Sequence, residues 1–136
     1  MNKIEDLNYL CSNTMVSHLG IEFTESGEGF LKAKMPVDHR TNHPSGILHG
    51  GASFALAEAI GSAASYLLVD REEYNVVCIQ LSGNHMLKVS TGIVYAHAQI
   101  IHQGSKTHVW DIRIKDENDA TASVMRLTNM ITEIQV

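Results

Sequence analysis

The chain has 136 residues, which fits one domain because a single hydrophobic core commonly organises about 100 to 150 residues. Hydrophobic residues make up 44% and charged residues 18%, a composition typical of folded proteins and unlike that of disordered chains. The formal net charge of −5 argues against nucleic-acid recognition, whose affinity comes from Lys and Arg releasing counterions. We therefore expect one domain over residues 1–136 and no nucleic-acid partner.

The amino terminus and the cysteines indicate a cytoplasmic protein. The first six residues include two acidic side chains and lack the basic start and apolar core of a signal peptide. Residues 51–69 approach membrane-spanning length, but they are rich in small residues and contain Glu58 near their centre, which favours a buried helix. Cys11 and Cys78 lack metal-ligand spacing, so we expect buried thiols in a reducing compartment.

The first half of the chain predicts a helix, a hairpin, a loop and a second helix. Apolar residues recur at helical spacing over residues 3–18. Residues 21–24 and 30–35 flank a Ser-Gly-Glu-Gly turn, and the second segment alternates in polarity, as in a β-hairpin. Residues 37–49 are polar and broken by Pro44 and Gly46, which indicates a long loop. Residues 50–68 then run without proline through good helix formers, which predicts a long helix.

Beyond residue 73 the hydrophobic period changes to the two-residue period of strands. Alternating patterns cover residues 77–81, 94–100 and 110–115, and residues 120–134 suit a final strand. Connections this short imply antiparallel neighbours, so we expect an α+β fold, a meander-like sheet with one dominant helix against it. Small residues on the helix would let the sheet curl tightly around it: Ala52, Ala55, Ala57, Ala59, Gly61, Ala63 and Ala64.

Glu58 is the only charged residue between Gly50 and Val69. Burying an unpaired carboxylate costs several kcal/mol unless its pKa rises or partners are supplied. A lone Glu in an apolar helix therefore needs an explanation. Two interpretations stay open. Either Glu58 lies on a solvated stripe with Ser62 and Ser65, which helical spacing also puts on one face, or it is a functional carboxylate.

Glycines mark the point where the chain enters this helix, at residues 46–51. The first amides of a helix lack internal partners, and aimed at a carbonyl oxygen they form an oxyanion hole for acyl transfer. The alternative is that the glycines are only a flexible helix entry. Gly50 and Glu58 are eight residues apart, or about 12 Å along a helix, which a Glu side chain cannot span. If both act on one reacting centre, they come from different subunits.

Short motifs surround this helix: His39-Arg40-Thr41, Pro44, residues 46–52 (Gly-Ile-Leu-His-Gly-Gly-Ala), Leu56-Ala57-Glu58, Gly61-Ser62, Asn84-His85 and Gly104-Ser105-Lys106. These motifs resemble those of the hotdog-fold acyl-CoA thioesterases. Within that superfamily the chain is similar to the bacterial subgroup of phenylacetate-pathway, 4-hydroxybenzoyl-CoA and 1,4-dihydroxy-2-naphthoyl-CoA thioesterases. The resemblance implies a curled antiparallel sheet around the central helix, dimers with continuous sheets, and usually tetramers.

The resemblance also implies catalytic roles. Glu58 is the nucleophile or general base, the Gly50 amide of the partner subunit polarises the thioester carbonyl, and Ser62 helps to place the attacking water. His49 lies beside the carbonyl or thiol. His43 stands where a Gln commonly orients the carbonyl or water, and because a His donor depends on tautomer and charge, activity is expected to vary with pH near neutrality. No cofactor is implied, because CoA is part of the substrate.

Substrate binding is implied at two further groups of residues. Lys side chains and backbone amides suit the phosphates of CoA, although a solvated lysine in a turn explains each of the two lysines equally well. The residues that fall where the family holds CoA are Asn84, His85, Lys88, Gly104, Ser105 and Lys106. Aromatic acyl groups are favoured by the resemblance, with medium-chain and hydroxyaryl groups open, and the candidates for the acyl pocket wall are Tyr66, Phe54, Met86 and the first helix.

Three alternatives to a metal-independent hydrolase are considered: a zinc site, a binding module and a dehydratase. His39, His43 and His49 lie in one loop and are potential zinc ligands, but no Cys or nearby carboxylate completes a site, so we expect no metal. A module that binds or senses acyl-CoA without hydrolysing it would not need Glu58 beside the thioester. A hotdog dehydratase would show a different pairing of His and acid. We therefore expect an acyl-CoA thioester hydrolase that works as a homo-oligomer.

Overall fold

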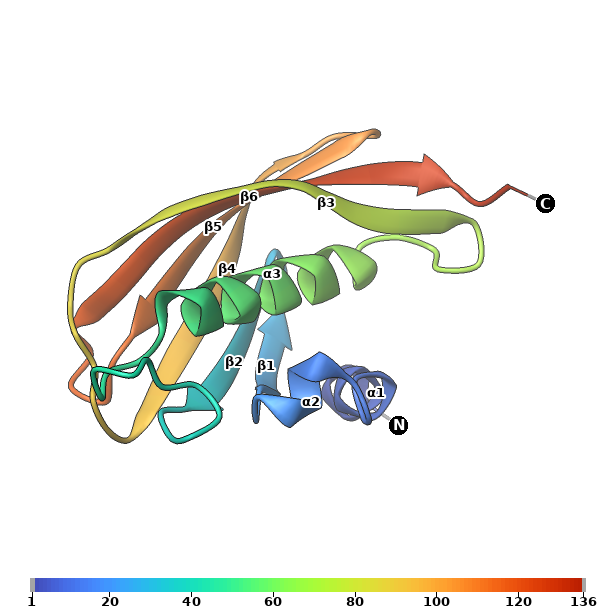
Figure 1. The fold of residues 1–136 in the computed structure, drawn as a ribbon. Helices are drawn as coiled ribbons and strands as arrows, with labels where there is room; N and C mark the ends of the chain where they lie inside the picture. Colours follow the sequence, from blue (N-terminus) through green and yellow to red (C-terminus); the bar gives the residue numbers. More distant parts are fainter. Residues whose placement is uncertain (1, 136) are drawn as a thin grey trace.

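The computed structural model describes residues 2–135, which form one antiparallel sheet curled around a central helix (Figure 1). The predicted α+β class and the hotdog arrangement are confirmed. The helices are α1 (Lys3–Leu10), α2 (Met15–His18) and α3 (Gly50–Tyr66). The strands are β1 (Glu22–Gly27), β2 (Phe30–Pro36), β3 (Tyr74–His85), β4 (Ile93–Gln103), β5 (Thr107–Lys115) and β6 (Thr121–Glu133).

The path of β3 differs from the predicted meander. The sheet order is β1-β2-β4-β5-β6-β3, so β2 pairs with β4, and β3 lies at the far edge beside β6. Short loops do keep neighbouring strands together elsewhere, but the connection from β2 to β3 contains all of α3 and crosses the concave face of the sheet (Figure 1). β3 is therefore an edge strand, on which Val77 and Ile79 are 49% and 51% exposed.

The amino-terminal helix predicted over residues 3–18 is two helices. α1 ends at Leu10, Asn13 adopts a left-handed backbone conformation with φ of 58°, and Thr14 caps α2 in a reciprocal arrangement with Ser17. Asn enters this conformation more easily than most residues, because its short polar side chain bonds locally. The apolar spacing that predicted one helix continues across the break, because apolar side chains of both helices line a cavity together with α3.

The core lies between α3 and the concave face of the sheet. Ala57 is fully buried, and Gly61 touches Leu127 of β6 so closely that a Cβ would lie 2.7 Å from Leu127 Cδ1. Small side chains thus let the helix backbone approach the sheet, as the sequence indicated. Ala55 and Ala59 instead face a cavity on the other side of the helix.

Both cysteines are free thiols, but each is half-buried where the sequence predicted burial. Cys11 follows α1 and Cys78 lies on β3. The small-residue segment over residues 51–69 is largely α3, packed against the sheet as expected. Among residues 2–135, no helix combines the length and apolarity that crossing a membrane requires.

A buried polar cluster fastens the last turn of α3 to β5 and β6. The Ser65 hydroxyl oxygen accepts hydrogen bonds from Trp110 Nε1 and Asn129 Nδ2, both at 2.8 Å, and lies 2.9 Å from His108 Nδ1. With its lone pairs used, the hydroxyl donates its proton to Nδ1, which makes His108 neutral with its own proton on Nε2. Burial lowers the pKa of His108.

We expect His108 to make stability depend on pH. An unfolded histidine titrates near 6.5, and burial holds the folded pKa below that value. Its contribution to the free energy of unfolding is therefore complete above about pH 6.5 and declines as the pH falls, because the unfolded state binds the extra proton. Chemical denaturation at fixed protein concentration from about pH 8 to about pH 5 measures this slope.

His108→Asn is the matched variant, because Asn offers Ser65 an acceptor but does not titrate. The variant is expected to be less stable than wild type at neutral pH and to lose less stability on acidification. An equal acid slope in both proteins would show that His108 is not the group responsible.

Candidate active site

The loop between β2 and α3 is held compact by its own hydrogen bonds. Thr41 is buried, its hydroxyl donates to the Pro36 carbonyl at 2.8 Å, and its own carbonyl accepts the His49 N–H at 2.8 Å. A turn follows in which the Gly46 N–H donates to the His43 carbonyl at 2.9 Å, with Gly46 at a φ of 86° that favours glycine. The rings of His43 and His49 consequently lie side by side, 5.4 Å apart between centroids.

The start of α3 leaves one backbone amide without a partner. His49 is the N-cap: its Nδ1 accepts the Gly51 N–H at 2.7 Å, and its carbonyl accepts the N–H groups of Ala52 and Ser53 at 3.0 and 3.3 Å. Among residues 2–135, nothing accepts a hydrogen bond from the Gly50 N–H. Because the start of a helix carries its positive dipole end, this amide suits a negatively charged oxygen.

His85, predicted to hold CoA, packs against Gly50. Its Nδ1 lies 2.8 Å from the Ser123 hydroxyl, and a Cβ on Gly50 would lie 2.8 Å from its Nε2. Phe54 packs edge-on against the same ring, at 5.5 Å between centroids. A cavity of about 350 Å³ opens here, and its lining includes Gly50, Ser53, His85, Met86 and Lys88. Phe54 and Met86, expected in the acyl pocket wall, thus belong to the neighbourhood of the helix start.

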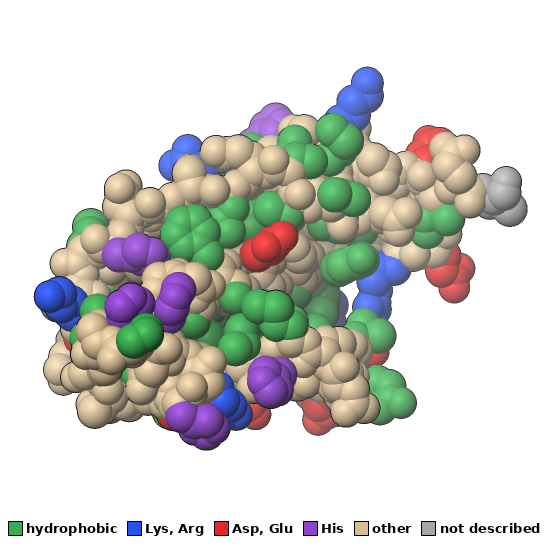
Figure 2. Space-filling model, in the orientation of Figure 1, with side chains coloured by type: hydrophobic (Ala, Val, Ile, Leu, Met, Phe, Trp, Pro, Cys, Tyr) green, Lys and Arg blue, Asp and Glu red, His purple; other side chains and the backbone are tan. Residues whose placement is uncertain are grey.

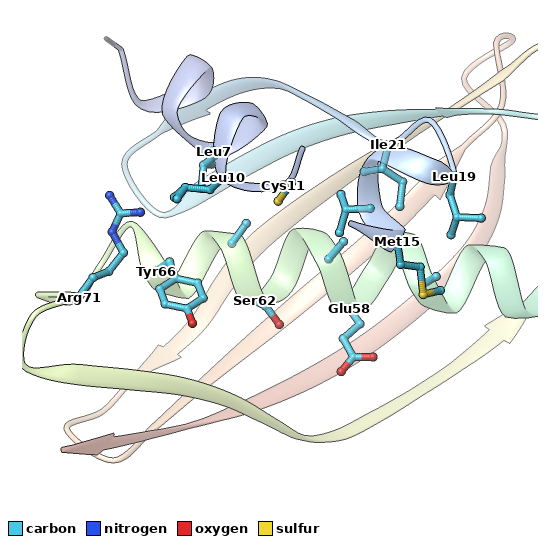
Figure 3. Close-up of a pocket in the computed structure, with 14 residues that line it drawn as sticks. Leu7, Leu10, Cys11, Met15, Leu19, Ile21, Glu58, Ser62, Tyr66 and Arg71 are labelled. Carbon is cyan, nitrogen blue, oxygen red and sulfur yellow. The ribbon is translucent and has the colours of Figure 1, made fainter. Parts of the chain in front are cut away.

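A larger cavity of about 550 Å³ separates α3 from the two amino-terminal helices (Figure 3). Tyr66 and the first helix line it, as predicted for the acyl pocket. Arg71 is the single basic side chain on its described lining. It lies in the segment that follows α3 and pairs with Asp6 of α1 at 2.8 Å. The remaining lining is mostly apolar and includes Leu10, Cys11, Met15, Leu19, Ile21 and Ala59.

Glu58 lies on the wall of this larger cavity, with Ser62 one turn later on the same face of α3 (Figure 3). Figure 2 shows an acidic side chain among hydrophobic ones on this side of the molecule, with several histidines to one side. Glu58 is exposed in the single chain and close to β3: burial, followed by the charge of Glu58, raises the pKa of the Cys78 thiol.

The stripe of Glu58, Ser62 and Ser65 that helical spacing predicted does not include Ser65. Ser65 is fully buried on the sheet side of the helix, where it belongs to the polar cluster with His108. Glu58 and Ser62 therefore share a cavity wall that Ser65 does not reach.

Within one chain the predicted catalytic residues form two separate groups. Gly50 and Glu58 are eight positions apart on α3, or about 12 Å at ~1.5 Å per residue. His43, His49 and Gly50 gather at the start of the helix, whereas Glu58 and Ser62 lie farther along it.

The predicted CoA residues are likewise divided between opposite ends of the sheet. His85 pairs with Ser123 near the start of β6, while the Lys106 carbonyl accepts the Ile131 N–H near its end. The two positions on β6 are about 26 Å apart at ~3.3 Å per residue. The group at one end comprises Asn84, His85 and Lys88, and the group at the other comprises Gly104, Ser105 and Lys106.

Sequence reasoning missed three residues that contact the site. Ser45 bonds His43, Ser123 bonds His85, and Cys78 approaches Glu58. Only Ser45 had a local signal, its position two residues after a histidine. The other two come from strands far along the chain. The zinc alternative also finds no support in the described residues, where no three His, Cys, Asp or Glu side chains gather as a metal site.

Comparison with known proteins identifies the family. Residues 45–123, which contain the helix start, Glu58 and the edge strand, match the thioesterase superfamily. The chain belongs to that superfamily. This thioesterase is 44% identical over 128 residues to the proofreading thioesterase EntH of Cronobacter turicensis, with 94% of this chain and 93% of that protein covered.

Solved structures agree with this membership. A thioesterase from Haemophilus influenzae superposes with a TM-score of 0.95 at 44% identity, covering 100% of this chain and 94% of that one. A variant of a thioesterase from Pseudomonas aeruginosa gives a TM-score of 0.94 at 43% identity, covering 96% and 94%. The predicted enzyme class, a thioester hydrolase, is thereby confirmed.

We expect His49 to act on stability and on catalysis through different atoms. His49→Ala removes the acceptor of the Gly51 N–H and should lower the free energy of unfolding by about 0.5–2 kcal/mol, the usual cost of losing an N-cap side chain. His49→Asn keeps a cap and should keep stability, yet lose thioester hydrolysis, because Asn has no N–H at the position of Nε2. Denaturation and thiol-release assays measure the two effects. If His49→Asn restored both properties, His49 would be a cap alone.

Proposed function

We propose that this thioesterase hydrolyses acyl-CoA in sites shared between two subunits, with Glu58 from one and the Gly50 amide from the other. The observation that carries the proposal is the free Gly50 N–H, since His49 occupies the other three amides of the first helical turn. Glu58 faces an apolar cavity about 12 Å farther along the same helix. Each chain thus holds half of an acyl-transfer site, and a second copy supplies the other half.

The edge strand β3 supports a two-fold assembly of this kind. β3 pairs with β6 on one side, and its other side has no strand partner among residues 2–135. Its apolar side chains Val77 and Ile79 are half exposed. Glu58 of α3 lies close to Cys78 of this strand. Antiparallel addition of β3 from a second copy would continue the sheet and bring the start of one α3 toward the middle of the other. A tetramer of two such dimers is part of the proposal.

In the proposed reaction the thioester carbonyl oxygen accepts a hydrogen bond from the Gly50 N–H, which strengthens as negative charge develops. As a general base, Glu58 takes a proton from water while the water oxygen adds to the carbonyl carbon; the C–S bond then breaks and the CoA thiolate takes that proton. As a nucleophile, the Glu58 carboxylate displaces the thiolate, and water cleaves the resulting anhydride. Both routes give free acid and CoA thiol, and Ser62 orients the water.

The larger cavity supports an uncharged, apolar acyl group. Its walls are mostly hydrocarbon with the Tyr66 side chain at one end, and its described cation, Arg71, is already paired with Asp6. A carboxylate at the far end of an acyl chain would therefore be buried without a partner, at a cost of several kcal/mol. Together with the resemblance to phenylacetate-pathway, 4-hydroxybenzoyl-CoA and 1,4-dihydroxy-2-naphthoyl-CoA thioesterases, this favours aromatic acyl groups.

The same two-fold assembly would reunite the two groups of CoA residues. Antiparallel pairing of β3 sets the His85 end of one strand beside the Tyr74 end of the other. Lys106 lies near that second end, because β6 joins Val76 of β3 to the Ile131 that bonds Lys106. Lys106 of one subunit and Lys88 of the other would then bind the CoA phosphates from two sides.

The test is release of free thiol from benzoyl-, hydroxyaroyl-, medium-chain and succinyl-CoA by the purified protein. We expect Glu58→Gln and Glu58→Ala to lose more than about 100-fold in kcat/KM, the scale of a catalytic acid or base. Succinyl-CoA, whose acyl group carries a charge, is expected to be the poorest substrate. Glu28→Gln removes an exposed carboxylate from the β1–β2 turn and serves as the matched control. Hydrolysis by Glu58→Gln at nearly the wild-type rate would rule out the role of this carboxylate.

A further inference from the structure

His43 is held by the residue two positions after it. The Ser45 N–H donates to His43 Nδ1 at 3.0 Å, and the Ser45 hydroxyl lies 2.7 Å from the same nitrogen. A backbone N–H can only donate, so Nδ1 must be the unprotonated nitrogen, and the hydroxyl donates to it as well. In the neutral ring the proton is therefore on Nε2.

The same arrangement recurs at His49, where the Gly51 N–H donates to Nδ1 at 2.7 Å. The two rings are neighbours, and in both the lone pair of Nδ1 is used by a backbone amide two residues later. Each ring therefore offers an Nε2–H donor and no free acceptor. Beside the Gly50 N–H, both rings thus present donors, which suits the oxygen of a carbonyl and favours Glu58 as the proton acceptor.

We propose that Ser45 is a positioning residue that fixes the tautomer and orientation of His43, so that His43 donates a hydrogen bond to the thioester carbonyl. This inference rests on the proposed function. An amide side chain at this place would always carry its donors on one atom, whereas a histidine has two nitrogens that exchange roles. A histidine that must donate from Nε2 needs a group that keeps Nδ1 unprotonated, and Ser45 supplies two hydrogen bonds for that purpose.

Among the described residues, no other side chain fixes the His43 ring. The ring that faces His43 is His49, which is itself held by Gly51, and none of the ion pairs formed by residues 2–135 includes His43. Turning the His43 ring over would put a carbon against the Ser45 N–H and hydroxyl and leave both without an acceptor. Ser45 therefore opposes both the wrong tautomer and the wrong orientation.

The first test reads the tautomer directly. Nitrogen NMR of the full-length protein labelled with ¹⁵N-histidine distinguishes protonated from unprotonated ring nitrogens, and comparison with His43→Gln assigns the His43 signals. We expect wild type and Ser45→Thr, which keeps the hydroxyl, to show His43 with its proton on Nε2. Ser45→Val has the same branched shape without the hydroxyl and should show increased exchange between the two tautomers. A wild-type ring protonated on Nδ1 would overturn the inference.

The second test separates positioning from mere folding by a double-mutant comparison. Ser45→Val is expected to lower kcat by about fivefold relative to Ser45→Thr, the size of one hydrogen bond, with a smaller change in KM. In a His43→Gln background the two variants should be equal, because Gln needs no tautomer to be chosen. The same ratio in both backgrounds would show that Ser45 acts on the loop and not through His43.

The two tests also keep this inference apart from the proposed function. If wild type hydrolysed none of the acyl-CoA substrates while NMR showed the Nε2–H tautomer, the proposed substrate class would fail and the role of Ser45 in fixing His43 would stand. If hydrolysis depended on Glu58 while NMR showed an Nδ1–H ring, the positioning role would fail and the hydrolase would stand.

Discussion

The fixed spacing of residues along α3 is the constraint on which the rest of the site depends. A helix rises by a set amount per residue, so the free Gly50 amide and the Glu58 carboxylate stay about 12 Å apart however the chain packs. One subunit cannot close that gap, but two antiparallel helices can. Two features favour the proposed dimer. The small residues of α3 let the sheet curl closely around it, and the edge of β3 has no strand partner among residues 2–135, so Glu58 lies close to a strand where a second sheet could continue.

Hydrogen-bond donors gather at the start of α3, whereas the acceptor carboxylate, Glu58, lies farther along the helix. His49 uses its ring and carbonyl to occupy three of the first four amides and leaves the Gly50 N–H free. Backbone amides in turn hold His43 and His49 as donors. In the proposed mechanism these donors therefore stabilise the developing oxyanion, and Glu58, which lies away from them, accepts the proton. The proposed reaction needs both halves at one carbonyl.

Sequence patterns predicted the elements that have one dominant period and missed features set by distant contacts. The helix over residues 50–68 and the later strands were found because their spacing is regular. The break at Asn13 was missed because the apolar spacing continues across it. Helical spacing grouped Ser65 with Glu58, but His108 and Asn129, more than 40 residues away, hold Ser65 against the sheet. The separation of Glu58 from Gly50 was predictable, because helix geometry is local; the partners of the edge strand were not.

Complementation between two inactive variants tests the shared site most directly. Gly50→Pro removes the free N–H at the first helical position, where proline is tolerated, and Gly50→Ala is the control that adds a Cβ but keeps the N–H. Heterodimers of Gly50→Pro and Glu58→Ala chains, purified through two different tags, would contain one intact site and one doubly altered site. If the site is shared, these heterodimers should have about half of the wild-type activity per dimer, although each variant alone is nearly inactive. Heterodimers that form and remain inactive would contradict it.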